Sequence, residues 1–227
     1  MADADQSPPR QRAVQERSVQ TKTQILNAAI TVLTTDGYAG ATTTRIQEAA
    51  GVSRGRLLHH FPSRNELLVA AVQQLAATRM GLLQQRSTWP DKPADRLDAA
   101  IEAMWETHQQ SYFWASTELW IAARHDEQLR AVLLPRERAL GQVIQDTVRS
   151  FFGPQLSALP NYQALANLLL TSMRGTALTY ALTGAPPATE PAVDEWKHVA
   201  RCLLGITPSG TPSYTDPLTT PNSGATV

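Results

Sequence analysis

Two arginines separated by a glycine, Arg54-Gly55-Arg56, are the residues of this 227-residue chain best suited by type and spacing to bind another molecule. They follow Ser53, a residue type that commonly caps helices, so we expect them in the first turn of a helix. In that position, two guanidinium groups stand beside free backbone amides and a site without a side chain. Such a helix start suits phosphate oxygens and base edges in a DNA groove.

Residues 42–66 contain the elements that would position these arginines. Thr42 suits the N-cap of a first short helix, and Gly51 suits the left-handed backbone that ends it. A second short helix then runs to Pro62, and Ser63-Arg64-Asn65-Glu66 has the spacing of a capping box for a longer third helix. Two short helices joined by a tight turn are typical of a helix-turn-helix. The alternative is a small helical bundle that does not bind DNA.

The same stretch resembles the N-terminal domain of the TetR family of one-component transcriptional regulators. Three motifs carry this resemblance over residues 20–67: Gly37-Tyr38 at a helix end, Ala-Ala-Gly-Val-Ser at 49–53, and Gly-x-Leu-x-x-His-Phe at 55–61 followed by Ser-x-x-Glu-Leu at 63–67. One departure is Leu58, where the family usually has a tyrosine whose hydroxyl reaches a phosphate. A leucine there either packs on a thymine methyl group or points inward.

The resemblance implies which residues contact DNA. They are Thr43, Thr44, Ser53, Arg54, Gly55, Arg56, His59, His60 and Arg64. An arginine of the second short helix can bind guanine O6 and N7, which provides about 1–3 kcal/mol of discrimination. Thr43, Ser53 and Arg64 suit phosphate contacts, which fix the register without recognising sequence. His60 has two alternative roles, a half-buried packing residue beside Phe61 or a pH-dependent phosphate contact.

Charge and cysteine content restrict the remaining function classes. The net charge is zero, but residues 1–64 hold eight cationic and five acidic side chains, so this part carries +3 and the rest −3. The single cysteine, Cys202, excludes an internal disulfide, and no Cys or His cluster has zinc spacing. Because no secretory leader or membrane-spanning stretch is evident, we expect a cytoplasmic protein without metal or cofactor.

Apolar residues recur every three or four positions along the chain, and no segment alternates as a strand does, so the sequence predicts an all-α fold. We expect a disordered arm over 1–17, a three-helix DNA-binding domain over 18–67, a larger helical domain for effector binding and dimerisation over 68–204, and a disordered tail over 205–227. Arginines 10, 12 and 17 suit a neighbouring minor groove, although the arm could equally be a solubilising tail. In the resembled family the long helix from 64 connects the two domains.

Aromatic and polar residues gather between positions 104 and 125, as in a small-molecule pocket. The candidate effector-binding residues are Trp105, His108, Tyr112, Trp114 and Glu118. Their largely apolar character favours a hydrophobic or amphipathic effector. The alternative is that these aromatic side chains only fill a helical core, and that Glu118 forms a structural ion pair with Arg124 or Arg174.

The last two helices, expected at about 161–182 and 191–204, have apolar stripes that suit a homodimer interface. The stripes consist of Leu169, Met173, Leu178 and Leu182 on one helix and Trp196, Val199, Ala200 and Leu203 on the other. A two-fold dimer would place two DNA-contacting helices about 34–36 Å apart on a palindromic operator. The alternative is that both helices belong to the core of one protomer.

The leading hypothesis is therefore a DNA-binding regulator, most often a repressor in the resembled family, released from its operator by an effector. One competing class is an all-α enzyme, but the chain has none of the common nucleophile, zinc or nucleotide motifs. Its helically spaced carboxylates at 95, 98, 102 and 106 indicate a solvated face instead. Another class is an architectural protein that binds DNA without sequence preference, for which a charge of +3 is low.

Overall fold

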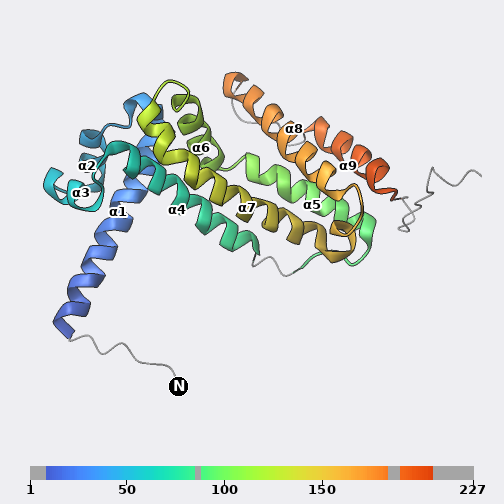
Figure 1. Ribbon diagram of the computed structural model, residues 1–227, viewed down its shortest axis with the longest axis horizontal. Helices are drawn as coiled ribbons and strands as arrows, with labels where there is room; N and C mark the ends of the chain where they lie inside the picture. Colours follow the sequence, from blue (N-terminus) through green and yellow to red (C-terminus); the bar gives the residue numbers. More distant parts are fainter. Residues whose placement is uncertain (1–8, 85–87, 184–189, 207–227) are drawn as a thin grey trace, which may run out of the picture. The chain divides into compact units, whose positions relative to one another are not determined.

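The computed structural model describes residues 9–84, 88–183 and 190–206, and all the elements it describes are α-helices (Figure 1), as the sequence predicted. The helices are α1 Pro9–Gly40, α2 Thr43–Ala50, α3 Arg54–His60, α4 Arg64–Gln84, α5 Pro93–His108, α6 Ser111–Ala122, α7 Glu127–Ser157, α8 Tyr162–Thr183 and α9 Pro191–Leu204. The predicted tail over 205–227 lies outside the described residues apart from Gly205 and Ile206, which close α9.

Helix α1 begins earlier than the sequence indicated, at Pro9, within the segment predicted to be a disordered arm. A proline suits the first turn of a helix, and the glutamine, alanine and arginine residues that follow are good helix formers, which explains the difference. Gly37 has φ 68° and ψ 179° and interrupts the helix near its end. The prediction that Gly37 ends the regular part of this helix is therefore confirmed.

Contacts between helices divide the chain into two compact units. Of the described residues, the first unit comprises 9–84 and 110–145, and the second comprises 88–109, 146–183 and 190–206. In the first unit, the buried faces of α1, α2, α3, α4, α6 and the first half of α7 share one apolar core. Its most buried side chains include Ile25, Leu33, Ile46, Leu57, Leu68 and Leu119.

The second unit consists of α5, α8, α9 and the end of α7. Trp105 of α5 packs against Trp196 of α9 with ring centroids 5.2 Å apart. Two ion pairs join the same helices: Arg201 binds both carboxylate oxygens of Asp98, and Lys197 Nζ lies 2.5 Å from Glu102 Oε1. Glu102 is exposed and Asp98 is half-buried, so both carboxylates lie at the surface as the sequence indicated. In addition they pair with cations about a hundred residues later in the chain.

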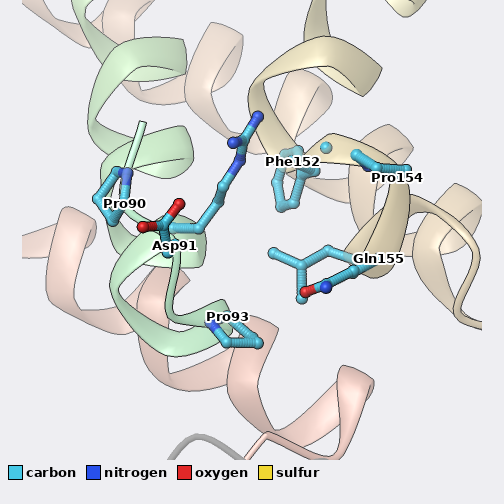
Figure 2. A pocket seen from close by; sticks show the side chains of 9 residues that line it. Pro90, Asp91, Pro93, Phe152, Pro154 and Gln155 are labelled. Atoms are coloured by element: carbon cyan, nitrogen blue, oxygen red, sulfur yellow. The ribbon is translucent and has the colours of Figure 1, made fainter. Parts of the chain in front are cut away.

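The end of α7 is held by Arg96 of α5. Its Nε and Nη2 atoms donate to the carbonyl oxygens of Phe151 and Ser150, each over 2.8 Å. Just beyond, Gly153 has φ 74°, and a Cβ atom there would lie 3.0 Å from the guanidinium. Beside this contact is a small pocket of about 180 Å³, with Pro90, Asp91 and Pro93 on one side and Phe152, Pro154 and Gln155 on the other (Figure 2). Arg96 therefore has a structural role here.

Candidate nucleic-acid interface

The two short helices α2 and α3 are capped as the sequence predicted. Thr42 Oγ1 accepts from the amide of Arg45 over 3.3 Å, and Ser53 Oγ accepts from the amide of Arg56 over 3.3 Å. Between them, Gly51 has φ 62° and ψ 32°, the left-handed conformation that residues other than glycine rarely adopt. This conformation turns the chain sharply, so that α3 begins three residues after it.

Four side chains fix α2 and α3 to the rest of the first unit. Ile46 of α2 and Leu57 of α3 are buried in the shared core, and Phe61 closes the end of α3. Gln24 of α1 donates to the carbonyl oxygen of Ala50 over 2.8 Å, which holds the end of α2. Because α3 has only seven residues, its position depends on these contacts and not on its own helical stability.

With Leu57 facing the core, the other face of α3 is exposed. Among the predicted DNA contacts, Thr44, Ser53, Arg54, Gly55, Arg56 and His59 are exposed, and Thr43 and His60 are half-buried. Leu58 is 41% exposed, so of its two alternatives, inward packing is excluded. A Cβ atom at Gly55 would meet no protein atom within 4 Å. The glycine is thus not required by packing, and it leaves the first turn of α3 open to an external molecule.

Arg64 differs from the other predicted DNA contacts, because its side chain is engaged within the protein. Its Nε donates to the carbonyl oxygen of Ala41 over 2.8 Å, and its Nη2 donates to the carbonyl oxygen of Tyr38. The guanidinium also lies over the Tyr38 ring, 4.0 Å from its centroid. These contacts join the start of α4 to the end of α1 and support the helix-turn-helix from behind.

Cationic and imidazole groups cluster at the end of α3. The rings of His59 and His60 are 5.4 Å apart, edge to face. The pKa of His60 is lowered by partial burial and, to a smaller extent, by the positive charges of His59, Lys22 and Arg56. Lys22 belongs to α1 and was absent from the residues predicted from the sequence. No motif marks it, because it comes close to α3 only through the packing of α1.

The five predicted effector-binding residues divide between the two units. In the second unit, Trp105 and His108 are buried and stacked, with ring centroids 6.1 Å apart and planes at 18°. Burial lowers the pKa of His108 to about 4, and its Nδ1 lies 2.9 Å from the carbonyl oxygen of Met104, so this imidazole is neutral at pH 7. Tyr112 and Trp114, both half-buried, lie on α6 in the first unit.

Glu118, the fifth of these residues, is also on α6. Its Oε2 accepts from the backbone amide of Tyr38 over 2.9 Å, and lies 3.3 Å from where a Cβ atom on Gly37 would be. The structural ion pair considered for Glu118, with Arg124 or Arg174, is replaced by this hydrogen bond to the backbone. The sequence did not indicate it because the donor lies eighty residues earlier.

A groove of about 440 Å³ lies between α5 and α9 in the second unit. It is lined by Glu102, Trp105, Glu106, Gln109, Glu190, Val193, Asp194 and Lys197. Trp105 is therefore the one predicted effector-binding residue that lines it. The groove combines an indole edge and the Val193 side chain with several carboxylates, so its chemistry is more polar than the sequence led us to expect.

Two further properties concern the described part of the chain as a whole. Within residues 9–84, 88–183 and 190–206, no helix has the length and apolar character needed to cross a membrane. The same residues contain no group of three or more His, Cys, Asp or Glu side chains placed to bind a metal ion.

Comparison with known proteins gives consistent matches. Residues 25–71 match the family model described as bacterial regulatory proteins, tetR family. The HTH-type transcriptional regulator CymR of Pseudomonas putida is 34% identical over 126 residues, which are 54% of this chain and 60% of CymR. An uncharacterized HTH-type transcriptional regulator of Mycobacterium tuberculosis is 27% identical over 184 residues, 79% of this chain and 92% of that protein.

Solved structures show the same fold. A transcriptional regulator from Rhodococcus sp. RHA1 superimposes with a TM-score of 0.61 at 18% identity, covering 80% of this chain and 96% of that one. The multidrug binding protein EbrR, complexed with ethidium, gives a TM-score of 0.59 at 20% identity and covers 81% of this chain and 97% of its own. The capped α2 and α3, the exposed face of α3 and these matches agree: the chain belongs to the TetR family of bacterial transcriptional regulators.

Proposed function

We propose that this protein is a homodimeric regulator that binds a palindromic operator through α2 and α3 and leaves it when a small effector binds. The observation that carries the proposal is the first turn of α3. There Arg54, Gly55 and Arg56 are exposed while Ser53 and Leu57, on either side, fix the backbone through a cap and a buried side chain. Side chains held on a rigid element can discriminate bases, because little ordering entropy is lost on binding.

Within this proposal, the residues of the helix-turn-helix and of the start of α4 have different roles. Arg54 and Arg56 bind guanine edges, and exposed Leu58 packs on a thymine methyl group. Thr43, Thr44 and Ser53 contact phosphates, as do His59 and His60. Arg64 takes a positioning role instead, because its donors are engaged with Tyr38 and Ala41. Residues 18–67 then act as the DNA-binding domain, and residues 68–204 serve effector binding and dimerisation.

The proposed dimer interface is the exposed face of α8 and α9. On α8, exposed small or apolar residues follow a four-three repeat, which keeps a stripe on one side of a helix. The stripe consists of Ala164, Leu168, Thr171, Gly175 and Leu178. On α9, Val199 and Leu203 are 38% and 36% exposed. This set replaces part of the predicted interface, because Leu169, Met173, Trp196 and Ala200 are buried within the protomer.

The proposed effector is hydrophobic or amphipathic. The groove between α5 and α9 favours the amphipathic choice, because Trp105 offers an apolar surface beside the carboxylates of Glu106 and Asp194. By linkage, an effector that binds the DNA-free arrangement better than the DNA-bound one lowers operator affinity by the same factor. A repressor released in this way is the regulatory sign that we propose.

Selection of bound duplexes from a random pool by the purified full chain tests this function. Enrichment of one palindrome with two half-sites spaced by about one helical turn is the expected result. Recovery of all sequences without preference would contradict operator recognition and favour an architectural role. Enrichment of an unrepeated half-site would contradict the dimer alone.

A further inference from the structure

The first part of α1 extends beyond the core of the first unit. The core of α1 begins at Ile25, yet the helix starts sixteen residues earlier, and residues 15–20 are all exposed. Val19 is 65% exposed. At 1.5 Å per residue, the sixteen residues of α1 before Ile25 span about 24 Å along the helix axis, and this part of α1 projects from the rest of its unit (Figure 1). A helix of this length is marginal in water by itself, so it persists as a continuation of the packed half.

The charge of this segment is strongly positive. Between residues 9 and 24 the chain has four cations, Arg10, Arg12, Arg17 and Lys22, against one acid, Glu16. Arg17 and Lys22 are exposed, and neither forms an ion pair with another residue that the structure describes. A surface with this charge and without an apolar stripe suits a polyanion better than another protein.

Helical periodicity places Lys22 on the side of α1 that packs into the core of the first unit. Lys22 precedes Ile25, Leu26 and Ala29 by three, four and seven residues, so it continues the stripe that packs into the core. Its charge acts on His60 of α3, as the lowered pKa of that imidazole reflects. Lys22 is therefore continuous with the exposed face of α3.

Arg17 lies about 140° around the helix from Lys22, on the side marked by Gln24. It precedes Gln24 by seven residues, two helical turns, and Gln24 donates to the carbonyl oxygen at the end of α2. Arg17 and Lys22 are five residues apart, about 7 Å along the helix axis, so their long side chains suit different phosphates of a duplex.

We propose that the first part of α1 is a second DNA-binding element, in which Lys22 and Arg17 contact phosphates beside the site occupied by α3. This inference rests on the proposed function, since it extends the same interface along the duplex. These contacts add affinity without recognising sequence, because phosphates are the same at every base pair. They also lengthen the protected segment beyond the bases that α3 contacts.

The test measures how DNA affinity depends on salt, with the full chain and two duplexes: the sequence enriched by selection and a 30-base-pair duplex of random sequence. The variant R17Q/K22Q removes both charges at exposed positions. The matched control, R130Q/R138Q, removes two exposed cations from α7 in the same unit. In R17Q/K22Q we expect weaker binding to both duplexes and a slope of log K against log salt that is shallower by about 1.8, roughly 0.9 for each lost phosphate contact. The control should keep the wild-type slope.

Three other outcomes would overturn the inference. An unchanged slope in R17Q/K22Q would exclude phosphate contacts from these residues, while equal losses in the control would attribute the effect to net charge. If the wild-type protein bound neither duplex, the proposed function and this inference would both fail. Binding with an unchanged slope would remove only the inference, so the two failures are distinguishable.

Discussion

The hydroxyl group of Tyr38, near the end of α1, lies 2.8 Å from Asp126 Oδ2, which directly precedes α7. The same hydroxyl is 3.0 Å from Asn65 Oδ1 on α4, while the Tyr38 amide donates to Glu118 on α6. Burial, and then the hydrogen bond to Asp126, raise the pKa of Tyr38, so the phenol keeps its proton. One tyrosine thereby connects four helices of the first unit, including α4, which follows the DNA-binding element.

Replacing Tyr38 by phenylalanine tests this connection. The ring stays under Arg64, but the hydrogen bond to Asp126 is lost, so we expect the free energy of unfolding to fall by about 1 kcal/mol. Urea denaturation measures the change. Y162F is the matched control, because the hydroxyl of buried Tyr162 donates to no other residue in the described part of the chain. Equal stability of Y38F and wild type would show that the hydroxyl contributes nothing net.

The open space around Gly55 leads to a prediction in which stability and binding change in opposite directions. Alanine is a better helix former and would meet no protein atom at this position, so G55A should stabilise the free protein by roughly 0.5–1 kcal/mol. If DNA approaches this backbone closely, the added methyl group weakens operator binding. Thermal unfolding and titration with the selected duplex measure the two effects. Tighter DNA binding by G55A would contradict a close approach at this residue.

The lowered pKa of His60 predicts that DNA binding depends on pH. The imidazole is largely neutral at pH 7 in the free protein, because burial and nearby positive charges disfavour its protonation. A bound phosphate favours the protonated form, so binding takes up a proton and affinity should rise as the pH falls from about 7.5 to 6. H60Q should flatten this dependence. An equal rise in wild type and H60Q would assign the effect to other groups.

Leu178 provides a test of the proposed dimer. It is 39% exposed on the α8 stripe, so L178D places a charge in the interface without disturbing the core of the protomer. We expect L178D to sediment as a monomer and to lose most of its affinity for the palindrome. L134D is the matched control, since Leu134 is 46% exposed on α7. A dimeric L178D with wild-type affinity would place the interface elsewhere.

The parts of the fold that depend on neighbouring residues could be predicted from the sequence. Thr42, Gly51 and Ser53 act within one turn of themselves, and the structure confirms each as a cap. Helix boundaries were less accurate where nothing in the sequence stops a helix, as in the early start of α1 at Pro9. Apolar spacing also identified α8 and α9 correctly as helices.

Partners distant in the chain could not be predicted. The sequence around Arg64 is the same whether its side chain binds a phosphate or the carbonyl oxygens of Tyr38 and Ala41. Only the packing of α4 on α1 selects the carbonyl oxygens. The same holds for Glu118 and for the ion pairs of α5 with α9. Likewise, an apolar stripe on α8 does not reveal which side faces the core. Leu169 and Met173 were therefore predicted at the dimer interface, although both are buried within the protomer.

The most direct test of the account is the effect of Arg56→Ala on sequence preference. Affinities of the wild type and of R56A are measured for the selected palindrome and for a duplex in which one guanine of each half-site is replaced by adenine. We expect the wild type to lose about 1–3 kcal/mol for each substituted guanine, and R56A to bind both duplexes with similar, weaker affinity. If R56A discriminated between the duplexes as strongly as the wild type, Arg56 on α3 would not contact that base. The same outcome with R54A would contradict the claim that the first turn of α3 recognises the operator.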